Sequence, residues 1–119
     1  MKFQDLLAYK RSFEFAMYIF KISKSFPKEE QYSLTDQIRR SSRNVAVNIA
    51  EATRKRRYEK HFISKLTDSD AENAETQGWL EFAHACEYLK KDEFDFLTEK
   101  SNEVGKLLNY MMNNPDKFL

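Results

Sequence analysis

The side chains of this chain that are best suited to chemistry are cations, and they cluster in the middle of the sequence. Lysine and arginine neutralise phosphates and release the counterions that surround a nucleic acid, so such binding is strongly salt-dependent. Tyr58 and His61 are interleaved with the cations and offer rings on which unpaired bases can stack. No motif that reads a base sequence accompanies them, so the pattern predicts weak, low-specificity binding of structured RNA or DNA. The candidate residues are Arg39, Arg40, Arg43, Arg54, Lys55, Arg56, Arg57 and Lys60.

Formal charge is unevenly distributed along the chain. Residues 1–38 carry six basic and five acidic side chains, residues 39–65 nine and two, and residues 66–119 five and twelve. The net charges are therefore +1, +7 and −7, which add up to the total of +1. The basic segment suits either a polyanion or the acidic surface of a neighbouring copy, and a third interpretation is that both segments are merely solvated helix faces. The arginines at 39, 40 and 43 lie within a helix and favour the neighbouring copy, whereas the cluster at 54–60 lies near a turn and favours nucleic acid.

One short motif has the spacing of metal ligands. Glu81 and His84 form a Glu-x-x-His pair, with both side chains on one face of a helix. A two-metal carboxylate site in a four-helix bundle needs two such pairs and a glutamate from each of the other two helices. The only other histidine, His61, has Tyr58 three residues before it. The sequence therefore predicts no metal site and no cofactor.

Other catalytic chemistry has little support in the sequence. The single cysteine, Cys86, lies beside Tyr88 and Leu89, which favours a core or interface position. A lone cysteine forms no internal disulfide and is typical of a reducing cytoplasm. The chain has no glycine-rich phosphate loop and no base beside any serine. We therefore expect a cytoplasmic protein that is not an enzyme.

The candidate residues have to be positioned by helices. Only two glycines and two prolines occur in 119 residues, so turns are scarce. No run of apolar residues is long enough to span a membrane, and charges interrupt the first residues, so neither a membrane span nor a secretory signal is expected. The prediction is one domain, residues 1–119, folded as an all-α antiparallel up-and-down four-helix bundle. The first expected helix covers about residues 4–24, the second starts near Ser33, the third runs to about Leu89, and the fourth covers about residues 93–112.

Start signals and length set the expected helix boundaries. An unbroken helix over residues 34–90 would extend roughly 85 Å at 1.5 Å per residue, too long for a compact domain, so a turn is expected near residues 53–58. Ser33 and Asp36 resemble a capping box at the start of the second helix. Asp92 and Asp95 provide a similar start signal for the fourth.

Small polar side chains interrupt the apolar stripes of the second and third helices. If the two rows face each other, their amides and hydroxyls can satisfy one another and fix the register of the helices. The alternative is a cavity filled by water or a ligand. The predicted polar seam consists of Ser41, Asn44, Asn48, Ser69, Asn73 and Thr76.

The first helix carries apolar residues on two nearly opposite faces. A surface helix of a monomer needs one apolar face, so the second face implies either cover by another subunit or deep burial in the bundle. One stripe contains Leu6, Tyr9, Phe13, Ala16, Met17 and Phe20. We expect the other to form the interface of a homo-oligomer, through Phe15, Tyr18, Ile19 and Ile22.

A set of spaced motifs resembles one known family. These are Phe26-Pro27, Gln37-Ile38-Arg39-Arg40-Ser41, Asn44-Val45, Asn48-Ile49-Ala50-Glu51, Phe62-Ile63 and Trp79-Leu80. The pattern is similar to that of the 23S rRNA-intervening-sequence proteins, which are bacterial four-helix-bundle proteins. Two departures stand out: Ala52 replaces a glycine that is usual in the family, and Asp68-Ser69 replaces a Gly-Ser element.

The resemblance implies an up-and-down four-helix bundle that assembles into a ring-like homopentamer. The accessory variability proteins of diversity-generating retroelements look similar, and they bind nucleic acid through a basic surface while assisting a reverse transcriptase. Most family members have no established molecular function. The expectation is therefore an oligomer that binds RNA or DNA weakly, and the alternative is a structural scaffold that binds a protein partner and no nucleic acid.

Overall fold

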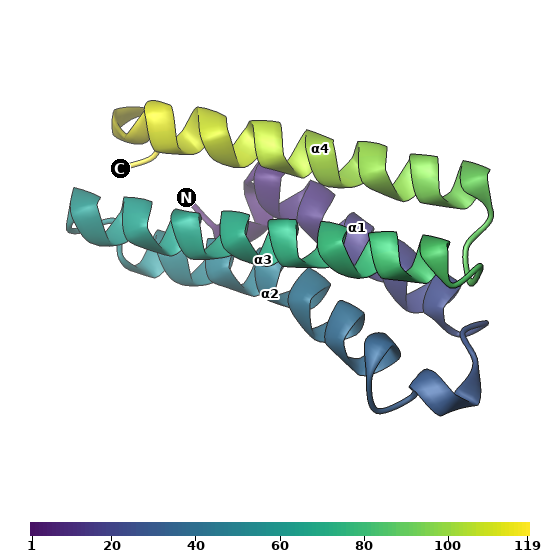
Figure 1. Ribbon diagram of the computed structural model, residues 1–119. Coiled ribbons are helices and arrows are strands. Elements are labelled where there is room, and N and C mark those ends of the chain that lie inside the picture. The colour runs from purple at the N-terminus through teal and green to yellow at the C-terminus, as the bar shows by residue number, and fades with distance from the viewer.

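The computed structural model describes residues 1–119 and consists of four long helices with no strand. The helices are α1 (Leu7–Ser23), α2 (Leu34–Arg54), α3 (Glu59–Ala85) and α4 (Lys91–Asn113), with short 3-10 turns η1 (Phe3–Asp5), η2 (Lys28–Glu30) and η3 (Pro115–Lys117). Each long helix packs on the next, and α4 packs back on α1, which closes the bundle (Figure 1). The bundle measures 44 × 25 × 20 Å. These features confirm the predicted all-α four-helix fold.

The core forms where the apolar stripes of the helices meet. On α2, Ile38, Val45 and Ile49 recur at helical spacing and are completely buried. They meet Leu66 of α3 and Leu108 of α4 in one continuous cluster. Burying a side chain of this size contributes roughly 1.5–3 kcal/mol, so tertiary packing along these stripes stabilises the helices. No helix of the chain is both long and apolar enough to cross a membrane.

The helix boundaries follow local hydrogen bonds that differ in part from the sequence expectations. The turn between α2 and α3 covers residues 55–58, inside the expected region. Helix α3 ends at Ala85, before the expected residue 89, because Glu87 adopts a left-handed conformation with φ 64°. The amide of Tyr88 then donates to the carbonyl of Ala83 at 2.9 Å, which closes the helix end.

The predicted capping side chains were wrong at both helix starts, although α2 begins at Leu34 with Ser33 as its N-cap residue, as expected. Ser33 makes no side-chain cap on α2. The Glu30 carboxylate takes that role, because its Oε1 accepts hydrogen bonds from the Ser33 hydroxyl at 2.6 Å and from the Leu34 amide at 3.3 Å. At α4, the amide of Lys90 donates to Glu93 Oε1 at 2.8 Å, so the helix begins earlier than expected from the aspartates.

The face of α1 that was predicted to form the oligomer interface lies mostly in the core, and the other stripe is exposed only in part, since its Leu6 and Ala16 are buried. Phe15 and Ile19, assigned to an oligomer interface, lie in the core of the chain's own bundle, and Ile22 packs against that core. Among those four residues only Tyr18 is exposed. On the other stripe, Phe13 is 51% exposed and Met17 40%. Periodicity reveals two faces but not their orientation, which is set here by packing against α2 and α4.

Candidate nucleic-acid interface

The strongest group of free cations lies at the turn between α2 and α3. Arg54 ends α2, Lys55 and Arg57 lie in the turn, and Lys60 lies in the first turn of α3. All four side chains are exposed, and none of them takes part in an ion pair. We call these four residues the turn cations. Their charges are therefore available to an external anion.

Lys65, the next cation along α3, differs from the turn cations because it is paired with carboxylates. Its ammonium lies 2.7 Å from the Glu51 carboxylate and 3.8 Å from that of Asp68. The hydrogen bond that Lys65 donates to the Glu51 carboxylate raises the pKa of Lys65, so its ammonium stays charged and already has a partner. Lys65 is therefore paired with acidic neighbours, whereas the turn cations make no ion pair, although Glu59 lies among them in the sequence.

Arg56 has a structural role beside the turn cations. Its Nε donates to the carbonyl of Thr53 at 2.9 Å, and a terminal guanidinium nitrogen reaches the carbonyl of Met1 at 3.4 Å. The contact joins the end of α2 to the N-terminal residues, so Arg56 is half-buried. A hollow of about 560 Å³ at this junction also has Lys2 and Arg54 in its lining. Sequence reasoning missed Lys2, because only the fold brings it to the turn.

Two rings accompany the turn cations. Tyr58 is 59% exposed, and its ring centroid lies 5.4 Å from that of His61. The guanidinium carbon of Arg57 lies 5.9 Å from the Tyr58 centroid. An exposed ring beside cations is a suitable platform for base stacking, as single-strand binding sites show.

The arginines of the middle of α2 do not join this surface, so the eight predicted binding residues do not form a single surface. Arg39 donates from Nε to the Ser23 hydroxyl at 2.8 Å, and its guanidinium carbon lies 4.9 Å from the Phe20 ring centroid. Arg43 lies 5.7 Å from the same ring. At 1.5 Å per residue, these side chains attach roughly 16–22 Å along α2 from the turn.

Arg40 is also committed to a neighbour on its own helix. Its guanidinium lies 3.8 Å from the Asp36 carboxylate, one helical turn away, and both side chains are well exposed. Such an exposed pair contributes little to stability. The mid-helix arginines therefore form a second, separate group.

The predicted polar seam is formed by some of its expected members. The hydroxyls of Ser41 and Thr76 hydrogen-bond at 2.8 Å, and the Ser69 hydroxyl donates to the carbonyl of Val45 at 2.7 Å. Each of these three hydroxyls is completely buried. Every buried side-chain nitrogen and oxygen has a hydrogen-bond partner within the protein. The seam is thus closed by its own side chains and backbone.

Asn73 hydrogen-bonds to α4, whereas the seam predicted from the sequence involved only the second and third helices. Its Nδ2 donates to the carbonyl of Ser101 on α4 at 3.0 Å, and the Ser101 hydroxyl donates back to Oδ1 at 2.8 Å. Ser101 lies at helical spacing between Leu97 and Val104 on the apolar face of α4, and this position in the sequence indicates that it is buried.

Asn44 and Asn48 lie outside the buried seam. Asn44 is exposed and Asn48 is half-buried, because both are rotated from the core face of α2 towards its flank. Glu72 lies near Asn44 on the neighbouring helix, and burial raises its pKa while Asn44 opposes that rise. The amides therefore belong to the rim between α2 and α3.

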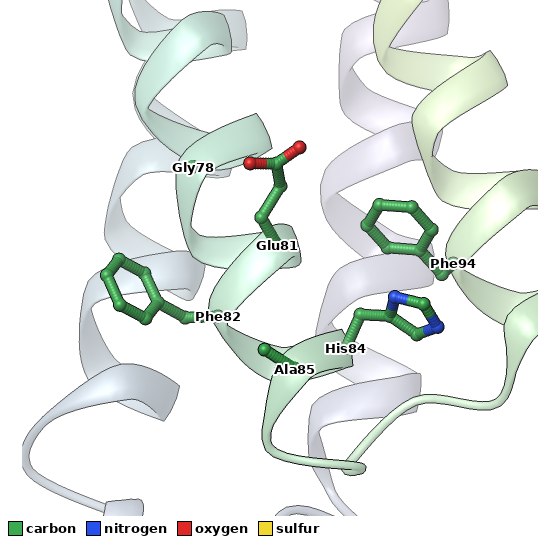
Figure 2. Close-up of a pocket in the computed structure, with 6 residues that line it drawn as sticks. All are labelled: Gly78, Glu81, Phe82, His84, Ala85 and Phe94. Carbon is green, nitrogen blue, oxygen red and sulfur yellow. The ribbon is translucent and has the colours of Figure 1, made fainter.

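The Glu-x-x-His pair lies in an open hollow near the end of α3, far from the turn cations along the helix (Figure 2). The His84 ring stacks on Phe94, with centroids 4.3 Å apart and planes at 13°. Nowhere do three or more histidine, cysteine, aspartate or glutamate side chains gather as metal ligands would. Cys86, expected in the core or at an interface, is exposed at the C-cap of α3, which excludes the core position.

Comparison with known proteins assigns the family. A family model described as 23S rRNA-intervening sequence protein matches residues 4–110. The chain belongs to this family. The matched residues of this 23S rRNA-intervening sequence protein include α1, α2, α3, both groups of arginines and most of α4.

A solved structure supports the same assignment. The chain is similar to a protein of unknown function from the S23 ribosomal protein family of Bacteroides thetaiotaomicron, with a TM-score of 0.81 and 29% identity over 89% of this chain and 98% of that one. No curated protein matches the chain. For this member of the 23S rRNA-intervening sequence protein family, the function has to be argued from its own surface.

Proposed function

We propose that this chain is a non-enzymatic, cytoplasmic protein that binds structured RNA or DNA weakly and with low sequence specificity. The observation that carries the proposal is the α2–α3 turn, where four exposed cations without ion pairs flank Tyr58 in the sequence, and the exposed Tyr58 ring lies 5.9 Å from the guanidinium carbon of Arg57. Phosphates supply the missing partners, and an unpaired base can stack on Tyr58. No rigid row of side chains is present to read base edges, so shape and charge dominate recognition.

The proposal includes self-association, and the family resemblance favours a homopentamer. Support comes from the outer surface of α1 and α2, where Phe13, Met17 and Val47 are exposed although they are large and apolar. A second copy packed on this surface would remove these side chains from water. Assembly would also place several α2–α3 turns on one particle, and multivalency would raise a weak affinity for a long polyanion.

The experiment compares two sets of substitutions with equal charge change. The first replaces the turn cations, as Arg54→Gln, Lys55→Gln, Arg57→Gln and Lys60→Gln, and leaves the structural Arg56 intact. The matched control replaces four exposed lysines elsewhere, as Lys10→Gln, Lys21→Gln, Lys28→Gln and Lys106→Gln. Binding of a labelled RNA hairpin is measured at low salt, with circular dichroism and light scattering as controls for folding and assembly.

The two variants separate local recognition from net charge. Loss of binding in the turn variant alone, with assembly intact, supports the proposal. Equal loss in both variants would assign the affinity to overall charge, and no loss in either would contradict the assigned surface.

A second candidate is a structural scaffold that binds a protein partner and no nucleic acid. One observation favours it, namely the exposed aromatic side chains at the opposite end of the bundle from the turn cations. An absence of RNA binding at low salt by the intact oligomer would favour this second function.

A further inference from the structure

The two most exposed aromatic side chains of the molecule lie near the end of the bundle away from the turn cations. Tyr32, before α2, is 86% exposed, and Phe82, near the end of α3, is 61% exposed. The Trp79 side chain is partly buried against the core, and its ring centroid lies 5.9 Å from that of Phe82. Together with Cys86 they line a hollow of about 410 Å³ between the start of α2 and the end of α3.

Phe82 also forms one wall of a second hollow. This hollow, of about 590 Å³, lies on the other side of Phe82 and is lined by Glu81, His84 and Phe94 as well (Figure 2). Figure 2 shows Phe82 projecting away from α4, while Glu81 and His84 lie on the side of α3 towards Phe94. Gly78 also lines this hollow, and a Cβ added there would have no other heavy atom within 4 Å. The exposed ring is thus a ridge between two open hollows.

The carboxylates are the only permanently charged side chains that line the two hollows. Glu30 lines the first hollow and Glu81 the second, and neither lining contains a lysine or arginine. A third carboxylate, that of Glu75, accepts a hydrogen bond from Trp79 Nε1 at 3.2 Å. Hydrogen bonds from Ser33 and Tyr88 lower the pKa of Glu30, which keeps its carboxylate charged. We call this apolar ridge with its carboxylates, formed by Trp79, Phe82, Glu30, Glu75 and Glu81, the acidic ridge.

We propose that the acidic ridge docks a cationic amphipathic segment of a partner protein. An apolar side chain of the partner enters a hollow beside Phe82, and its lysines or arginines meet the surrounding carboxylates. Exposed tryptophan, tyrosine and phenylalanine are the side chains that most often anchor protein interfaces. Complementary charge at the rim selects the partner and speeds its encounter.

Two other occupants fit less well. Nucleic acid is disfavoured, because the carboxylates would repel its phosphates. A second copy of the chain offers its own basic segment, residues 54–60, but Tyr58 is the only large apolar side chain in that segment. The inference does not rest on the proposed nucleic-acid function, since Phe82 attaches to α3 roughly 33 Å along the helix from Lys60.

The experiment uses two natural reporters. Trp79 is the only tryptophan and Cys86 the only cysteine, and both line the first hollow. The probe is a synthetic helical peptide with leucines along one face and lysines on the other, and its control carries glutamates in place of the lysines. Trp79 emission and the rate of Cys86 modification by a small thiol reagent are followed as each peptide is added to the full chain.

The expected result is saturable binding of the lysine peptide, with shifted Trp79 emission and protection of Cys86, and no response to the glutamate peptide. Phe82→Ala weakens binding about tenfold or more, as expected for an aromatic anchor. Glu81→Lys weakens it as well, whereas Phe96→Ala, at an exposed ring that pairs with Tyr18 instead, leaves it unchanged.

Four outcomes would overturn the inference. Three are an absence of saturable binding up to about 1 mM peptide, equal binding of the two peptides, and equal binding by the Phe82→Ala variant. A change in Trp79 emission that depends on protein concentration without peptide would assign the ridge to a second copy, and would overturn it too.

Discussion

The Tyr88 hydroxyl donates a hydrogen bond to Glu30 Oε2 at 2.9 Å, although the two residues are 58 positions apart. Tyr88 lies in the connection between α3 and α4, and Glu30 lies in η2 between α1 and α2. The other carboxylate oxygen of Glu30 accepts from the Ser33 hydroxyl and the Leu34 amide, where it caps α2. One carboxylate therefore fixes both connections at this end of the bundle.

This arrangement predicts acid sensitivity through Glu30. The Ser33 hydrogen bond, followed by that from Tyr88, holds the pKa of Glu30 below its ordinary value. The resulting stability is present above the unfolded pKa of about 4.3 and is lost as pH falls through the folded pKa. The Glu30→Gln variant should lack this dependence, so its thermal midpoint should fall less than that of the wild type on acidification below about pH 5.

The matched control for Glu30 is its neighbour. Glu29 is exposed and makes no side-chain hydrogen bond or ion pair, so Glu29→Gln should retain the acid dependence of the wild type. The hydrogen bond between Tyr88 and Glu30 also affects stability at high pH, because it raises the pKa of Tyr88 to about 12. Stability from Tyr88 is present below its unfolded pKa of about 10 and is lost as pH rises through its folded value. Identical acid profiles for the wild type and Glu30→Gln would contradict this account.

Replacing Glu87 by glycine should stabilise the fold. Glu87 is the only residue with a positive φ, at 64°, and its amide donates to the carbonyl of His84 at 3.0 Å within the closing turn of α3. Glycine adopts this conformation without steric cost, so Glu87→Gly should raise the free energy of unfolding by about 1 kcal/mol. As a control, Glu99→Gly in the exposed interior of α4 should lower it by about 1 kcal/mol. Denaturant unfolding measures both, and destabilisation by Glu87→Gly would refute the assigned helix end.

Ser101 should contribute more to stability than its size suggests. Its hydroxyl is the donor to the buried Asn73 Oδ1, so Ser101→Ala leaves that oxygen without this partner. The expected loss of unfolding free energy is about 1–3 kcal/mol. Asn48→Ala, at the half-buried rim, should change it by less than about 0.5 kcal/mol. Equal effects at the two sites would show that the buried network adds no specific stability.

The exposed stripe of α1 should control assembly, and the buried stripe should control folding. Phe13→Ser combined with Met17→Ser removes apolar surface that is already exposed, so the mass measured by light scattering should fall towards that of a monomer. Phe15→Ala instead opens a cavity in the core and should cost about 3–5 kcal/mol. An unchanged mass for the double variant would exclude this stripe as the interface.

Sequence reasoning succeeded where the information is local and periodic. The helical spacing of Ile38, Val45 and Ile49 was sufficient to predict both a helix and its core face. The same periodicity gave α1 two apolar faces but could not orient them, because the choice depends on the shape of the neighbouring helices.

The contacts that sequence reasoning missed are long-range or unusual. Glu30 as a cap for α2, Lys2 beside the turn cations and Ser101 opposite Asn73 come from separate parts of the chain. The end of α3 was misplaced because Glu87 occupies a position that glycine usually marks. At the turn, the charge density of the sequence coincides with exposure in the fold, whereas Arg39 and Arg40 have partners within the chain.

The most direct test of the central claim is the salt dependence of RNA binding by the wild type and by the variant without the turn cations. If each of the four cations neutralises one phosphate of a duplex, the logarithm of the association constant falls with the logarithm of salt concentration at a slope of roughly −3.6 per binding site. The account predicts a slope of about this size for the wild type, and either no measurable binding or a slope near zero for the variant. The same slope for both proteins, or no binding by the wild type at low salt, would contradict it.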